Sequence, residues 1–138
     1  MRVVLDSNVI IAAFITQGIC HLILELCLSD HHIFLSEDIL EEIGKNLRKK
    51  AKMQPLLVDA ALSFLKKRAE VKSIEITEAH PRLDRQDAKV AALAAAVKAD
   101  ALITGDKDLL SLKEFKSVPI ISPRDFWNLL RTQNKDLL

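Results

Sequence analysis

Two carboxylates stand directly after short apolar runs of the sequence. Asp6 follows the run at residues 3–5, and Asp106 closes the motif Ile-Thr-Gly-Asp at residues 103–106. In an open parallel sheet the functional crevice lies beyond the carboxyl ends of the strands, so two such acids converge if their strands are neighbours. Burying like charges together is costly unless a cation neutralises them. We therefore expect a cation site there; the alternative is that either acid only caps the following helix.

Two further acids carry weaker signals. Asp87 begins an alanine-rich helical stretch, where the helix dipole alone favours an acid, and the same explanation covers Asp84 one turn earlier. Glu42 lies near the apolar face of another predicted helix, although an ordinary solvated acid is the alternative. Glu41 replaces Glu42 if the helix register shifts by one residue.

Together these positions bring up to four carboxylates to one end of a sheet. Hard oxygen ligands of this kind favour Mg²⁺ or Mn²⁺ over zinc. Such a site can activate a water molecule and stabilise in-line attack on a phosphodiester. The histidines are scattered and indicate no nucleophilic triad. Cys20 and Cys27 lie seven residues apart on one predicted helix face, which favours two inert thiols over a disulfide or a zinc site.

Basic residues form two clusters in the sequence. The first contains Lys45, Arg48, Lys49, Lys50 and Lys52, and the second contains Lys66, Lys67 and Arg68. Each cluster is either a solvated helix face or a rim that binds phosphates. The formal net charge of +1 does not by itself indicate a nucleic-acid binder. Aromatic residues are only 4% of the chain, so base stacking should be minor.

The elements that would position these residues alternate between strand and helix patterns. Strands are predicted at 3–5, 33–35, 74–76, 101–103 and 118–121. Helices are predicted at 9–14, 20–29, after the cap Ser36, at 56–65, from 84 or 85 to 99, and from Pro123 onward. This alternation indicates an α/β domain with a parallel sheet covered on both faces. We expect one domain over residues 1–133 and a frayed tail at 134–138.

Hydropathy gives an expectation about location. The apolar run after Met1 is too short for a signal peptide and ends at Asp6. No stretch approaches about 18 uninterrupted apolar residues, so no membrane span is predicted. The expected location is the cytoplasm.

The motifs in order resemble the PIN domain. The resemblance is carried by Leu-Asp-Ser-Asn-Val-Ile at residues 5–10, by residues 36–43, by residues 87–94, by Ile-Thr-Gly-Asp-Lys-Asp-Leu-Leu at 103–110, and by the closing residues 120–126. It covers nearly the whole chain. The first motif and the one at 103–110 are specific together, whereas the segments at 36–43 and 87–94 are individually weak.

The resemblance implies a fold and a set of site residues. The fold is a three-layer α/β/α sandwich with strand order 3-2-1-4-5. The implied catalytic and metal-binding acids are Asp6, Glu42, Asp87 and Asp106. The implied supporting residues are Asn8, Thr104, Asp108 and Asp84. Many relatives have consecutive acids where this chain has Asp87-Ala88, as in the Asp-Ala variant of VapC-type toxins.

The resemblance also implies an activity and partners. Relatives of this kind are Mg²⁺- or Mn²⁺-dependent ribonucleases, often homodimers, and toxins that a protein antitoxin silences. Phe126 and Trp127 are candidates for a dimer or antitoxin contact, although ordinary core packing explains them better. Lys45, Arg48 and Lys49 are the candidates for RNA contact.

Other classes of protein also place acids at strand ends. A phosphotransfer enzyme of the haloacid dehalogenase type needs a second Asp two positions after the first, where this chain has Asn8. A response-regulator receiver needs an acidic pair near the first strand. The sequence has no G-x-G-x-x-G motif, which counts against a dinucleotide-binding domain. A non-catalytic RNA- or protein-binding module with the same fold stays open as an alternative.

Overall fold

A mixed sheet forms the centre of the molecule, seen in a computed structural model that describes residues 1–75 and 79–136, with side chains through residue 133. Its strand order is β3-β2-β1-β4-β6-β5. The parallel strands are β1 (Arg2–Leu5), β2 (His32–Ser36), β3 (Glu70–Lys72), β4 (Ala101–Ile103) and β6 (Val118–Ile121). The short strand β5 (Glu114–Phe115) pairs antiparallel with β6 at the edge.

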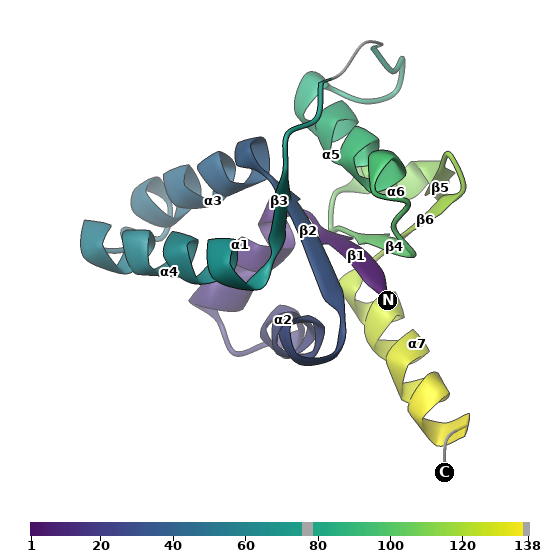
Figure 1. Ribbon diagram of the computed structural model, residues 1–138, viewed down its shortest axis with the longest axis horizontal. Helices are drawn as coiled ribbons and strands as arrows, with labels where there is room; N and C mark the ends of the chain where they lie inside the picture. The colour runs from purple at the N-terminus through teal and green to yellow at the C-terminus, as the bar shows by residue number, and fades with distance from the viewer. Residues whose placement is uncertain (76–78, 137–138) are drawn as a thin grey trace.

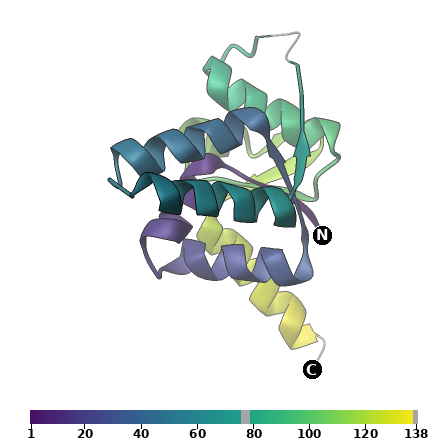
Figure 2. The ribbon, with the colours of Figure 1, turned by 60° about the vertical axis from the view of Figure 1, so that its left-hand side comes forward.

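Helices cover both faces of this sheet. They are α1 (Ser7–Ile15), α2 (Ile19–Asp30), α3 (Glu37–Lys49), α4 (Pro55–Arg68), α5 (Arg85–Ala96), α6 (Lys107–Leu112) and α7 (Pro123–Asp136). Helices α1 to α4 lie on one side of the sheet, α5 lies on the other against β1 and β4, and α7 packs beside α2 (Figures 1 and 2). The predicted α/β/α sandwich and the relative order of its five parallel strands are confirmed.

The third strand lies earlier in the chain than predicted. The pattern favoured 74–76, but β3 occupies Glu70–Lys72, so the prediction is wrong for residues 74 and 75, and residue 76 lies outside the described residues. Strand β3 is an edge strand with a single apolar residue, Val71, between two charged ones. An edge strand can be half-exposed, so its apolar signal is weak.

The sequence pattern also missed β5. The hairpin that joins β5 to β6 turns through Lys116 and Ser117, which both have positive φ angles of 46° and 71°. Turns of this type usually contain Asn-Gly or Asp-Gly, because those residues tolerate positive φ. The usual sequence signal for a hairpin is therefore missing here.

The helix starts follow the expected capping chemistry. The backbone N–H of Ile39 donates to Ser36 Oγ at 3.1 Å, which caps α3. Pro55 occupies the first turn of α4, where its missing N–H costs nothing. Asp6, Asp84 and Asp106 cap α1, α5 and α6. Three of the predicted site residues therefore also act as helix caps.

The core is aliphatic and centres on β1 and β4. Residues 3–5 and 101–103 are buried almost completely, as expected for strands covered on both faces. Ala88, Ala91 and Ala94 of α5 are also buried. Their small side chains let α5 lie close to β1 and β4, and so bring the first turn of α5 near the carboxyl ends of these strands.

The C-terminal helix packs on this core. Phe126 is fully buried and Trp127 is half-buried against the core cluster, and the ring of His31 lies edge-on to that of Phe126 at 6.1 Å. Core packing therefore accounts for Phe126. The predicted frayed tail at 134–138 stays a prediction: α7 extends to Asp136, the side chains from residue 134 on are not described, and residues 137–138 lie outside the described residues.

Two other expectations concern the thiols and the membrane. Both cysteines are free, and burial raises the pKa of Cys27 to about 12, which makes its thiol inert. In the described residues no single helix is long and apolar enough to cross a membrane. The pair α1 and α2 passes that test by length and composition only when taken together, and it is bent by 108°.

Truncation of Phe126 tests whether α7 belongs to the core. We expect Phe126→Ala to lower the free energy of unfolding by about 3–5 kcal/mol, because it leaves a cavity where a fully buried ring was. Leu129→Ala, on the same helix but 41% exposed, should cost much less. Urea denaturation followed by circular dichroism measures both. Equal and small effects would show that α7 is only loosely attached.

Candidate functional site

The pairing of β1 with β4 sets the position of the first acid. Leu5 lies opposite Ile103 in the parallel register, and the N–H of Asp6 donates to the carbonyl of Ile103 at 2.9 Å. The N–H of Thr104 in turn donates to Ile121 of β6 at 3.1 Å. Asp6 and Thr104 therefore leave the sheet side by side, at its carboxyl edge.

The carboxylate of Asp6 is buried and held by three donors. Thr104 Oγ1 donates to its Oδ2 at 2.7 Å, the N–H of Ser7 donates to Oδ1 at 2.8 Å, and Asn8 Nδ2 donates to Oδ2 at 3.3 Å. Burial raises the pKa of Asp6, the bonds from Thr104 and Ser7 oppose this, and the charges of Glu42 and Asp106 raise it further. The predicted support from Asn8 is thus present as a hydrogen bond.

Thr104 links the first acid to the last. Its hydroxyl donates to Asp6 and also accepts from the N–H of Asp106 at 3.0 Å. Asp106 Oδ1 accepts from the N–H groups of Asp108 and Leu109 at 2.9 and 3.0 Å, which caps α6. Asp106 therefore does cap α6, and this capping, together with Thr104, holds its carboxyl group in place near Asp6.

Asp87 lies in the first turn of α5 and faces the other acids. Its N–H donates to Oδ1 of the cap Asp84 at 2.8 Å. The pKa of Asp87 is raised to about 7, first by desolvation and then by the negative charges of Asp106, Asp84, Asp6 and Asp108. The structure thus places Asp87 beside Asp106 and Asp108, while the charge of Asp6 acts on Asp87 and the charge of Glu42 acts on Asp6.

Helix α3 supplies Glu42 rather than Glu41. Glu42 Oε2 accepts a hydrogen bond from Gln86 Nε2 of α5 at 2.7 Å, and its charge acts on Asp6. Glu41 is exposed and has no comparable contact with an acid of the cluster among the described residues. Of these two neighbours, Glu42 therefore has the contacts with α5 and Asp6, and its place among the ligands stays a prediction.

The donor set fits a hard divalent cation. Oxygen atoms of Asp87, Asp106 and Asp108 lie within 4.8 Å of one another. None of the four ion pairs found in the described part of the chain includes an acid of this cluster. Like charges gathered without a basic partner are costly, and a cation with oxygen ligands would offset that cost.

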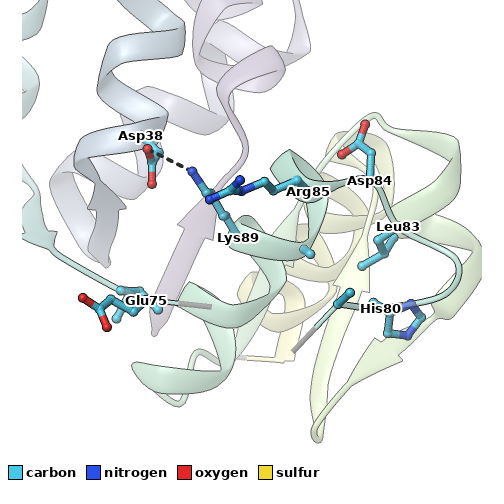
Figure 3. A pocket seen from close by; sticks show the side chains of 10 residues that line it. Asp38, Glu75, His80, Leu83, Asp84, Arg85 and Lys89 are labelled. Atoms are coloured by element: carbon cyan, nitrogen blue, oxygen red, sulfur yellow. Dashed lines mark hydrogen bonds and ion pairs between the residues drawn. The ribbon is translucent and has the colours of Figure 1, made fainter. Parts of the chain in front are cut away.

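Two contacts between α3 and α5 were not predicted from the sequence. One is the Gln86–Glu42 bond, and the other joins Lys89 Nζ to Asp38 Oδ1 at 3.4 Å (Figure 3). Asp38 and Lys89 also line a cavity of about 560 Å³ beside α5. Neither contact has a sequence signal, because each depends on how two separate helices approach.

Comparisons with known proteins agree with this geometry. A family model described as the PIN domain matches residues 2–108. The chain is similar in structure to VapBC2 from Rickettsia felis bound to a DNA fragment from their promoter, with a TM-score of 0.64 and 16% identity over 88% of this chain and 98% of that one. VapBC-1 from nontypeable Haemophilus influenzae gives a TM-score of 0.62 and 16% identity over 90% and 99%. A comparison with curated protein sequences found no match.

The raised pKa of Asp87 predicts how stability depends on pH. Without metal, the folded protein keeps this proton up to about pH 7, whereas the unfolded chain loses it near 3.8. Stability should therefore fall as pH rises through this window. Asp87→Asn should flatten the profile and stabilise the metal-free protein above the window by about 1 kcal/mol, after solvent screening of a half-exposed group. Thermal melts in EDTA measure this, with Asp59→Asn on α4 as the control. A rise of stability with pH would contradict the prediction.

The two bonds of the Thr104 hydroxyl predict a cost for its removal. Thr104→Val leaves Asp6 and the N–H of Asp106 without this buried partner, so the free energy of unfolding should fall by about 1–3 kcal/mol. Thr104→Ser keeps the hydroxyl and should recover most of the loss. Chemical denaturation of both variants distinguishes the hydroxyl from the methyl group, and equal losses would assign the effect to packing.

Proposed function

The chain belongs to the PIN domain family, and on this premise we propose that it is a metal-dependent endoribonuclease that hydrolyses phosphodiester bonds of RNA. One observation carries the proposal. Asp6, Glu42, Asp87 and Asp106 come from four separate segments, and of these Asp87 and Asp106 lie together with Asp108, with their oxygen atoms within 4.8 Å of one another. Uncompensated acids at the carboxyl edge of a parallel sheet are what a phosphodiesterase with bound divalent metal requires.

The proposed ligands are these four acids, and Mg²⁺ or Mn²⁺ is the proposed ion. When bound, the ion would lower the pKa of a water molecule and stabilise the charge that develops on the phosphate. Thr104 and Asn8 orient Asp6 by hydrogen bonds. Asp84 caps α5 and so positions Asp87, and Asp108 adds a carboxylate beside Asp106.

Glu42 has a separate part in this proposal. Its carboxylate comes from the opposite side of the site, on α3, and Gln86 of α5 holds one of its oxygens at 2.7 Å. Gln86 keeps Glu42 directed toward the first turn of α5, which also contains Asp87. The site therefore includes residues from both helical layers that flank the sheet.

We propose further that the chain is the toxin of a toxin–antitoxin pair. The similar solved structures are VapBC assemblies, which supports a protein partner for this chain as well. Phe126 is buried in the core and is not available to such a partner, whereas Ile15, Leu22 and Phe64 are exposed apolar residues on α1, α2 and α4. The same proposal includes a homodimer acting on cytoplasmic RNA.

Cleavage of RNA by the purified chain tests the activity. We expect cleavage of mixed structured RNAs with Mg²⁺ or Mn²⁺ and none with EDTA. Asp6→Asn, Glu42→Gln, Asp87→Asn and Asp106→Asn should each lower the rate by about 100-fold or more, because each removes a proposed ligand. The matched control is Glu37→Gln, which removes the same group from an exposed residue of the same helix and should change the rate little.

The variants also separate an enzyme from a binding module. Asparagine keeps the capping oxygen of Asp6 and Asp106, so these variants should remain folded. Binding of RNA without cleavage by the unmodified chain, together with no metal-induced rise in melting temperature, would refute the nuclease and support a non-catalytic module. Loss of cleavage accompanied by unfolding would instead assign these acids a structural role.

A further inference from the structure

A groove of about 530 Å³ runs between α3 and the first turns of α5. Glu42 and Gln86 line it, and so do Asn46, Lys45, Lys49 and Lys50. Glu42 is also a proposed metal ligand, so one end of the groove borders the proposed site.

Charge changes sign along this groove. Asp38, Glu41 and Glu42 lie toward the start of α3, and Lys45, Lys49 and Lys50 follow toward its end. Lys49 is seven residues after Glu42, which places it about 10 Å further along the helix axis. At the acidic end, a bound divalent cation would be needed to offset the repulsion between the carboxylates and a negatively charged chain. Further along the groove, the same chain would contact the lysines.

Lys45 and Lys49 of α3 and its C-cap Lys50 are available for a ligand. All three are exposed, and none forms an ion pair within the part of the chain that the structure describes. Lys89, on the opposite wall, is paired with Asp38 at 3.4 Å (Figure 3). The lysines that can bind an anion therefore lie at the C-terminal end of the α3 wall.

Arg48 lies on another side of the same helix. Its guanidinium is 3.6 Å from the position that a Cβ atom on Gly44 would occupy, and Leu62 of α4 is 3.0 Å from that position. Arg48 thus faces α4, and it is absent from the residues that line the groove. Arg48 has the same charge as its neighbour Lys49, but its side chain points toward α4 and not into the groove. It is therefore a suitable control for the substitution of Lys49.

We propose that this groove binds the sugar-phosphate backbone of RNA on one side of the scissile phosphate, through Lys45, Lys49 and Lys50. The inference rests on the proposed function, since it uses the same site. The distance from Glu42 to Lys49 corresponds to about three stacked nucleotides. Lysines on phosphates position a strand but do not read its bases, so the groove contributes affinity without sequence preference. An acidic peptide is the competing ligand, but a phosphodiester chain also accounts for the proposed metal ligand Glu42 at one end of the groove.

Salt-dependent binding tests this directly. The probe is a fluorescent single-stranded RNA of about 16 nucleotides with mixed sequence. Binding is measured by anisotropy in Mg²⁺ with the Asp6→Asn chain, so that the probe stays intact. Adding Lys45→Ala, Lys49→Ala and Lys50→Ala together should weaken binding by about 10-fold or more near 100 mM salt, and should reduce the slope of log K against log salt by about 2.

Matched variants distinguish the effect of the groove lysines on RNA binding from the effect of the total charge of the protein. Lys66→Ala, Lys67→Ala and Arg68→Ala together remove the same three charges from the end of α4, and the affinity should change by less than about three-fold. Lys49→Ala should weaken binding more than Arg48→Ala does. Thermal melts of each variant check that the fold is retained.

Several outcomes would overturn the inference. Equal losses in the two triple variants would assign the effect to net charge, and no loss in the groove variant would show that RNA binds elsewhere. Weakened binding of a polyglutamate peptide with unchanged binding of RNA would make the groove a protein site. These experiments also distinguish a failure of the proposed function from a failure of this inference. If the unmodified chain binds RNA through the groove but shows no metal-dependent cleavage, the nuclease is refuted and the assignment of the groove to RNA binding is retained.

Discussion

The parallel pairing of β1 with β4 is the constraint on which the site depends. Residues 3–5 of β1 and 101–103 of β4 are apolar and buried between the helical layers, so their register cannot shift without disrupting the core. That register places Asp6 beside Thr104, whose hydroxyl donates to Asp6 and accepts from the backbone of Asp106. The free energy of core packing thus holds together two acids that would otherwise repel each other.

Capping and site formation use the same side chains in this protein. Asp6, Asp84 and Asp106 each accept backbone N–H groups at the start of a helix, and each lies in or next to the acid cluster. A helix N-terminus carries a partial positive charge, which partly offsets the cost of an acid placed there. The N-termini of three helices meet at one edge of the sheet, and their partial positive charges therefore lower the cost of gathering several carboxylates there.

The elements and candidate site residues that could be predicted from the sequence are those marked by a local pattern of apolar and polar residues. Asp6 and Asp106 follow buried strands, and Glu42 lies next to the apolar face of an amphipathic helix, so periodicity was sufficient to place these residues in their elements. Strand β3 has only Val71 as an apolar residue, and edge strands carry little pattern. Gln86 and Lys89 meet α3 across a gap between helices, and no local rule describes how two distant helices approach.

The double role of Asp6 has an evolutionary consequence. Asparagine is as good an N-cap as aspartate, and it retains an oxygen for the N–H of Ser7. A single nucleotide change converts an aspartate codon into an asparagine codon. Such a change would keep the cap of α1 but place an amide group where Thr104 and Asn8 donate to the second oxygen. The cap alone therefore does not maintain aspartate at this position, and the requirement for it comes from the second oxygen.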